Sequence, residues 1–171
     1  MNMYYIKRGE DFMPRNLLKE ARENLLESVE GVNDTVLNKK PSEDSWSIAQ
    51  VLRHLIDTEA MVVTQLKKAI LEESEKVEDK PLQAVASRKH KVKTPYDPPT
   101  DYIEKATLIN NLHESRQQLL LFLDEADEQS LDNKSMKHPA FGAVNLRQMI
   151  EFIGYHEERH TDQIEEIKQL V

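Results

Sequence analysis

A chain of 171 residues with a net charge of −8 and no cysteine excludes several classes of protein. Its 31 acidic residues would repel a phosphate backbone, so we expect no nucleic-acid partner. The lack of cysteine excludes disulfides and thiolate ligands, and no apolar run approaches the roughly 20 residues of a membrane span. We expect one soluble domain over residues 1–171, and a cytoplasmic one, because the first 15 residues lack the apolar stretch of a signal peptide.

The first helical pattern follows Pro14, a residue favoured in the first turn of a helix. Apolar residues then recur in steps of three and four, at Leu18, Ala21, Leu25, Val29, Val32 and Val36. This spacing predicts one helix that ends between Asn38 and Lys40, before Pro41.

The second helical pattern begins in the stretch "DSWSIAQVLRHL", residues 44–55. Ser47 and Gln50 have the spacing of a capping box, in which each side chain accepts a hydrogen bond from the backbone N–H of the other residue. Trp46 immediately precedes this cap, so we expect its ring to pack against the start of the helix. The apolar stripe continues to Ile70 and ends in a polar run.

Residues 75–100 interrupt the helical pattern with four prolines and the basic stretch "SRKHKVK". Helices of a bundle are usually joined by about 2 to 8 residues, so this connection is unusually long. It predicts a crossover over one end of the bundle, with a short helix around "PLQAVAS".

Two further helices are predicted after this connection. One begins near Asp101, with Glu104 as its reciprocal acid, and the other begins at Asn145, with Gln148 completing the N-cap pair. No β pattern of comparable strength and no internal repeat is evident. Four amphipathic helices that each bury one face predict an all-α, antiparallel four-helix bundle.

The last helix contains "GYHEERHTDQ", with two histidines four residues apart. Steps of three and four from Ile153 place His156 and His160 on the inward stripe. A zinc-protease site is excluded because only 11 residues follow His160, too few to return a third ligand. A di-iron site is excluded because it needs a second Glu-x-x-His, which the chain lacks.

His54 supplies a third inward histidine, because it keeps the same spacing on the second helix. His54, His156 and His160 would form a three-imidazole site, which leaves metal positions open for water or substrate. Zinc, nickel, iron and manganese all suit such ligands, and the sequence does not choose among them. The alternative is that the histidines of the last helix are core residues hydrogen-bonded to their neighbours.

The other histidines have weaker patterns. His113 is either an inward or a surface residue of the third helix, and His138 lies near the bundle mouth or has a structural role. His90 belongs to the basic crossover, where we expect it to be solvated.

A metal-bound histidine usually donates its second N–H to a carboxylate or a carbonyl. The acids near enough in sequence are Asp57, Glu59, Glu157 and Asp162, and each is alternatively a solvated surface charge. Gly154, in the middle of a helix, indicates a close helix contact.

Two stretches carry a family resemblance. "WSIAQVLRHLIDTE" and "HPAFGAVNLRQMIEFIGYHEERHTDQI" resemble the DinB-like superfamily, which includes bacillithiol- and mycothiol-dependent S-transferases. The resemblance implies a crossed-over four-helix bundle, a divalent ion on His54, His156 and His160, and a homodimer. The substrate-binding residues of the better understood branches are not recognisable in this chain.

Three functions follow as hypotheses. The first is transfer of a low-molecular-weight thiol, activated by the metal, to an electrophilic small molecule. The basic residues of the crossover are Arg88, Lys89, Lys91 and Lys93. These residues and Arg159 would then hold carboxylates of the thiol; alternatively, they are solvated. The second is hydrolysis of a small molecule by metal-bound water, and the third is a non-catalytic dimeric bundle with a structural metal.

Overall fold

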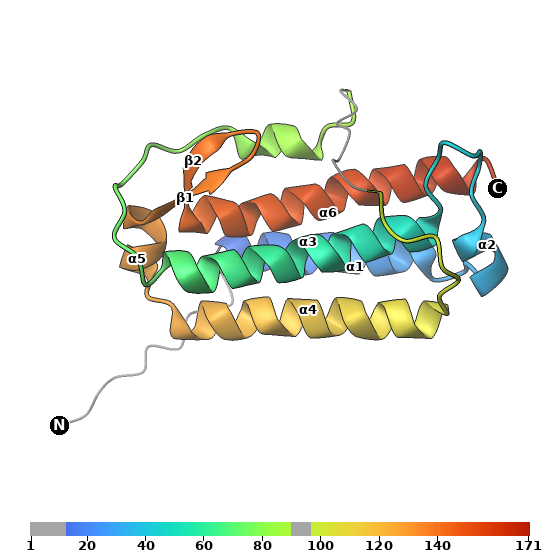
Figure 1. The fold of residues 1–171 in the computed structure, drawn as a ribbon, viewed down its shortest axis with the longest axis horizontal. Coiled ribbons are helices and arrows are strands. Elements are labelled where there is room, and N and C mark those ends of the chain that lie inside the picture. Colours follow the sequence, from blue (N-terminus) through green and yellow to red (C-terminus); the bar gives the residue numbers. More distant parts are fainter. Residues whose placement is uncertain (1–12, 90–96) are drawn as a thin grey trace.

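The computed structural model describes residues 13–89 and 97–171 (Figure 1). In chain order the elements are α1 (Met13–Val29), α2 (Asp34–Asn38), α3 (Ile48–Ala69), the 3₁₀ helix η1 (Leu82–Ala86), α4 (Lys105–Glu125), α5 (Glu128–Asn133), β1 (Ser135–His138), β2 (Gly142–Asn145) and α6 (Leu146–Lys168). Among the described helices, none combines the length and the apolar character that crossing a bilayer would need.

The helices α1, α3, α4 and α6 form a four-helix bundle with a long crossover, as predicted. Helix α1 packs on α6, and α3 packs on both α4 and α6. Figure 1 shows that α1 and α6 run in one direction and that α3 and α4 run in the other. The expectation of a fully antiparallel bundle is therefore wrong, because the neighbours α3 and α4 are parallel.

The parallel arrangement of α3 and α4 explains the length of the crossover. A helix of 22 residues is about 33 Å long, so the chain must travel back along the bundle before it can start a parallel neighbour. The connection accordingly runs along the bundle rather than over one end, with η1 lying on α6 (Figure 1). A short helix was predicted there, and it is η1. His90, Lys91 and Lys93 lie outside the described residues.

The predicted caps of α3 and α6 position the helices that carry the histidines. Both hydrogen bonds of the Ser47–Gln50 capping box are present. At α6, Asn145 Oδ1 accepts a hydrogen bond from Gln148 N at 2.8 Å. The side chain of Gln148 bonds instead to the backbone of Lys80, which fixes the crossover to the start of α6.

Two predicted helix boundaries are wrong, one because a local cap starts a separate helix and the other because a side chain distant in sequence bonds the helix start. The first helical pattern breaks after Val29, and Asn33 caps the separate helix α2 by accepting from Val36 N. The third helix begins at Lys105 rather than at Asp101, because Asp34 Oδ1 accepts from Lys105 N at 2.7 Å.

A hairpin precedes α6, although the sequence predicted no β structure. Strand β1 pairs antiparallel with β2 over four residues each, with Ser135 opposite Asn145 and His138 opposite Gly142. Gly142 has a φ of 68°, a backbone conformation that glycine adopts readily. The strands are too short to establish a period-two pattern, which is why the sequence missed them.

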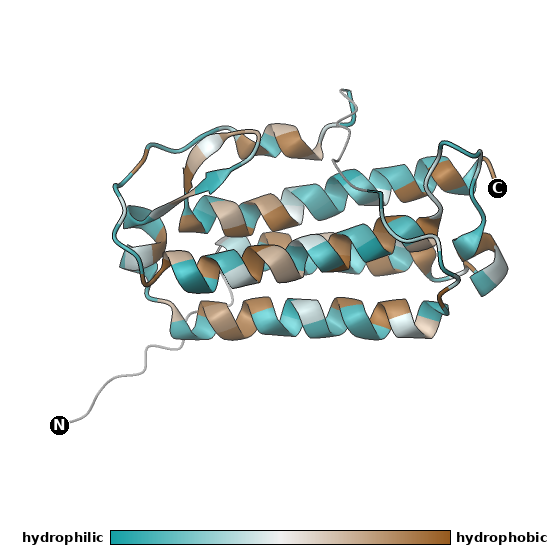
Figure 2. Cartoon of the chain, viewed as in Figure 1, coloured by the Kyte–Doolittle hydropathy of each residue, from teal (hydrophilic) through white to brown (hydrophobic). Residues whose placement is uncertain are grey.

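A layer of buried charge divides the core into two apolar halves. Figure 2 shows hydrophobic and hydrophilic residues mixed along every long helix. One buried cluster includes Leu66, Leu119 and Ile150, and the other includes Leu25, Leu52, Leu108 and Ile164. Between them lie buried charged residues from all four helices, namely Arg22, Glu59, Arg116 and Glu157.

Candidate metal centre

The three predicted histidines converge in the structure. His156 Nε2 lies 3.2 Å from His54 Nε2 and 3.1 Å from His160 Nε2. One ligand atom from each ring lies within 4.8 Å of the others. The rings come from two helices, α3 and α6, and one helical turn separates the pair on α6. The inward spacing of the sequence therefore brings all three rings to one point.

The geometry fits a shared metal ion. An ion about 2.0 to 2.1 Å from each nitrogen holds neighbouring nitrogens about 3.3 Å apart in tetrahedral coordination. Without a cation, a neutral His156 offers either one hydrogen or one lone pair at Nε2, which can bond only one of the two neighbouring Nε2 atoms. A divalent ion satisfies three lone pairs at once, so the donor set suits an ion better than mutual hydrogen bonds.

The surroundings keep the three rings neutral, which is the state that binds a metal. Burial, followed by the charge of the neighbouring His54, lowers the pKa of His160 to about 3. Burial, followed by the charges of His160 and His54, lowers the pKa of His156 well below its ordinary value. Burial also lowers the pKa of His54, against the opposing effect of Asp57.

Aromatic rings enclose the histidine cluster. The ring centroid of Trp46 lies 5.2 Å from that of His54 and 6.5 Å from that of His160, with the indole stacked on the latter. Phe152 stacks on His156 at 5.2 Å. Trp46, the only tryptophan of the chain, donates from Nε1 to an oxygen of Asp97 at 2.9 Å. The sequence expected Trp46 to pack on the helix start, and the structure adds that it covers the histidines.

The second nitrogen of His160 has a partner that the sequence did not predict. Its Nδ1 lies 2.8 Å from Gln163 Oε1, one turn further along α6. Of the predicted acids, Asp57 instead accepts from Arg53, and Asp162 is exposed. Polar residues three positions after an inward histidine are the signal that could have found Gln163.

The other two predicted acids, Glu59 and Glu157, belong to a closed ring of buried ion pairs. Arg22 donates from Nη2 to Glu59 at 3.0 Å and from Nε to Glu157 at 2.6 Å. Arg116 donates from Nε to Glu59 at 2.6 Å and from Nη2 to Glu157 at 2.7 Å. Sequence reasoning missed both arginines, although Arg22 keeps core spacing between Leu18 and Leu25.

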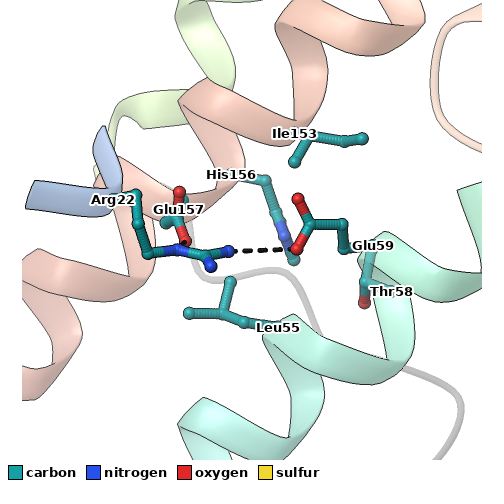
Figure 3. Close-up of a pocket in the computed structure, with 7 residues that line it drawn as sticks. All are labelled: Arg22, Leu55, Thr58, Glu59, Ile153, His156 and Glu157. Carbon is teal, nitrogen blue, oxygen red and sulfur yellow. Dashed lines mark hydrogen bonds and ion pairs between the residues drawn. The ribbon is translucent and has the colours of Figure 1, made fainter. Parts of the chain in front are cut away.

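A small cavity lies between three residues of this ring, Arg22, Glu59 and Glu157, and His156 (Figure 3). Its volume is about 10 Å³, which is about that of one water-sized probe. The residues that line it are Arg22, Leu55, Thr58, Glu59, Ile153, His156 and Glu157. The charged layer therefore reaches the histidine cluster at His156, across this cavity.

The remaining described histidines stand outside the cluster. His113 is exposed on α4, which settles its predicted alternatives in favour of the surface. His138 ends β1, where its Nδ1 accepts from Ala140 N at 3.1 Å and its ring packs on Phe152 at 4.5 Å. It therefore has a structural role in the hairpin, and its ring packs on Phe152, which stacks on His156.

The described cations of the crossover are already engaged or solvated. Arg88 makes a bidentate pair with Glu166, at 2.9 and 2.8 Å. Lys89 is exposed. Arg159 is buried and donates to the carbonyl of Ser87. Arg159 is thus not a solvated surface residue, and Arg88 does not present a free guanidinium.

The chain matches a known family over most of its length. The model of the DinB superfamily matches residues 17–164, and the chain belongs to this superfamily. YuaE of Bacillus subtilis is 35% identical over 162 residues, which cover 91% of this chain and 98% of YuaE. A protein of Oceanobacillus iheyensis named "Putative metal-dependent hydrolase OB0413" is 26% identical over 138 residues, covering 81% of this chain and 73% of that protein.

Solved structures support the same fold. YfiT from Bacillus subtilis, described as "a probable metal-dependent hydrolase with an unusual four-helix bundle topology", has a TM-score of 0.67 at 18% identity and covers 99% of this chain and 91% of its own. The four-helix bundle protein TT2238 has a TM-score of 0.63 at 19% identity, covering 90% and 97%. At these identities the likeness establishes the fold alone.

Proposed function

We propose that His54, His156 and His160 bind one divalent metal ion and that the protein is a metal-dependent hydrolase of a small molecule. The observation that carries this proposal is the convergence of three neutral imidazoles. His156 Nε2 lies 3.2 Å from His54 Nε2 and 3.1 Å from His160 Nε2, and the ring of Trp46 stacks on His160. The name of the relative OB0413 supports hydrolysis among the chemistries open to such a site.

The residues of the chain have distinct roles in this proposal. The bound ion would supply Lewis acidity, and three neutral imidazoles would leave it its full charge. Trp46 and Phe152 would exclude bulk water from two sides of the cluster. Burial keeps protons from competing for the ring nitrogens, because it lowers the pKa of each ring.

Thiol transfer is the second candidate. The chain has no cysteine, so a thiolate at the metal would have to come from the substrate. Of the predicted anchors for the carboxylates of such a thiol, Arg88 is paired with Glu166, and Lys91 and Lys93 lie outside the described residues. A homodimer, a small-molecule substrate and a cytoplasmic location stay predictions.

Metal analysis tests the first half of the proposal. We expect protein prepared without a histidine tag to bind about one ion per chain, and His160→Ala to reduce binding at least tenfold. Trp46 lies against two of the rings, so its fluorescence should change on titration with nickel or cobalt. His113→Ala, at an exposed histidine, is the matched control and should bind like the wild type. A stoichiometry far below one would contradict the metal site.

Turnover separates the candidate functions. Chelator-sensitive hydrolysis of model esters or amides, without added thiol, is the expected result. Chelator-sensitive conjugation of a small thiol to a model electrophile, without hydrolysis, would establish the second candidate instead. A metal that is only structural would leave both assays blank, and its removal would lower the melting temperature of the wild type.

A further inference from the structure

Two nitrogens lie within hydrogen-bond distance of one oxygen of Gln163. His160 Nδ1 lies 2.8 Å from Gln163 Oε1, and Arg88 Nη1 approaches the same atom at 3.4 Å. Arg88 is itself held by its bidentate pair with Glu166 on α6. The crossover is thereby tied to the candidate metal centre through a single amide.

The arginine determines which end of the amide faces the histidine. A guanidinium has only donors, so Arg88 can contact the oxygen of Gln163 but not its NH₂ group. Rotating the amide by half a turn would aim that NH₂ group at a cation. The oxygen is therefore the stable neighbour of both Arg88 and His160.

The amide oxygen in turn determines the tautomer of the imidazole. An oxygen only accepts, so the nitrogen beside it, His160 Nδ1, must carry the hydrogen of the neutral ring. The opposite nitrogen, Nε2, then carries the lone pair. Nε2 is the atom that lies 3.1 Å from His156 Nε2, at the centre of the cluster.

We propose that Gln163, held by Arg88, is a positioning residue that fixes the Nε2 lone pair of His160 toward the centre of the three histidines. The expected consequence of this inference, a higher metal affinity, rests on the proposed metal site. The tautomer itself is a property of the metal-free chain. The crossover would thus influence metal affinity without contributing a ligand, since Arg88 lies in it.

The test is the His160 tautomer and the metal affinity of matched variants. Nitrogen-15 NMR of metal-free wild type should show the Nδ1–H form of His160 only. Gln163→Leu removes the acceptor and should give a mixture of tautomers and about 10- to 100-fold weaker nickel binding. Gln163→Glu keeps an acceptor and should retain the Nδ1–H form and bind nickel within a few-fold of the wild type. Gln65→Leu, at an exposed glutamine of α3, is the control and should change neither.

The outcomes separate this inference from the proposed function. A wild type that binds no nickel but has the Nδ1–H form contradicts the metal site and leaves the tautomer supported. Wild-type affinity and a single tautomer in Gln163→Leu would overturn the inference while the metal site stands. If Gln163→Leu does not fold, Arg88→Met gives the same readouts, because it frees the amide to rotate; an unchanged tautomer and affinity there would also overturn it.

Discussion

Buried neutral histidines make the metal-free protein sensitive to acid. The pKa of His160 is about 3 in the folded chain, whereas an unfolded histidine titrates near 6.5. Between these values the unfolded chain binds more protons, so the free energy of unfolding falls as the pH falls. The folded chain therefore favours the neutral form of the cluster, and protonation of its histidines favours unfolding.

We expect the metal-free wild type, kept in chelator, to lose stability steadily between pH 6.5 and pH 4. His160→Leu should show a shallower loss, because it removes one of the buried titrating groups. Urea unfolding at a series of pH values measures both slopes. His113→Ala should follow the wild type, since that side chain is exposed. Equal slopes for the wild type and His160→Leu would contradict the burial of a neutral ring.

At the scale of elements, α1 and α6 make a close contact at Gly154. A Cβ atom there would lie 2.5 Å from Leu17 Cγ and 2.9 Å from Leu17 Cδ2. Real Cβ atoms do not approach that closely, so the mid-helix glycine suspected from the sequence does mark a close helix contact. The glycine thus allows α1 to pack tightly beside the helix that carries two of the histidines.

Gly154→Ala should lower the stability by about 1 kcal/mol, because overpacking outweighs the gain of about 1 kcal/mol in helix propensity. In a Leu17→Ala background the same change should be stabilising, because the obstructing side chain is gone. Thermal unfolding of the four proteins of this cycle measures the reversal. Gly31→Ala, where an added Cβ meets nothing within 4 Å, is the control. The same sign in both backgrounds would show that Leu17 is not the cause.

At the scale of the whole molecule, the charged layer has an approximate twofold arrangement. Arg22 donates to the carbonyl of Leu112, and Arg116 donates to that of Leu18. The acceptor of Arg22 thus lies four residues before Arg116, and the acceptor of Arg116 lies four residues before Arg22. Glu59 and Glu157 each follow the N-cap of their helix by twelve residues. The pairs α1–α3 and α4–α6 therefore correspond. Residues 18–26 and 112–120 share the pattern L-x-E-x-R-x-x-L-L, a likeness that the sequence analysis missed.

We expect Glu59→Gln to cost about 3 to 5 kcal/mol, because two buried guanidinium groups then share one carboxylate. Adding Arg22→Met should recover part of this loss, since Arg116 and Glu157 remain as a neutral pair. Denaturant unfolding measures both variants. Glu165→Gln removes a half-exposed partner of Lys168 and should cost at most about 1 kcal/mol. A double variant at least as unstable as the sum of its single variants would contradict a balanced ring.

Local patterns in the sequence predicted much of the fold and the three histidines of the site. The starts of α3 and α6 follow from capping residues three positions apart, and the inward histidines follow from helical spacing. The partners of these histidines could not be predicted in the same way. Gln163 is fixed by Arg88, 75 residues away, and Asp34 begins a helix 71 residues later.

The sequence by itself determined which faces of the helices are buried and that three imidazoles share those faces. These properties depend on spacing within one helix, and periodicity records such spacing directly. Only the tertiary structure decided that α3 and α4 are parallel, that four charges close into a ring, and which oxygen meets His160. Each of these depends on contacts between segments far apart in the chain, and one sequence carries no local trace of such contacts.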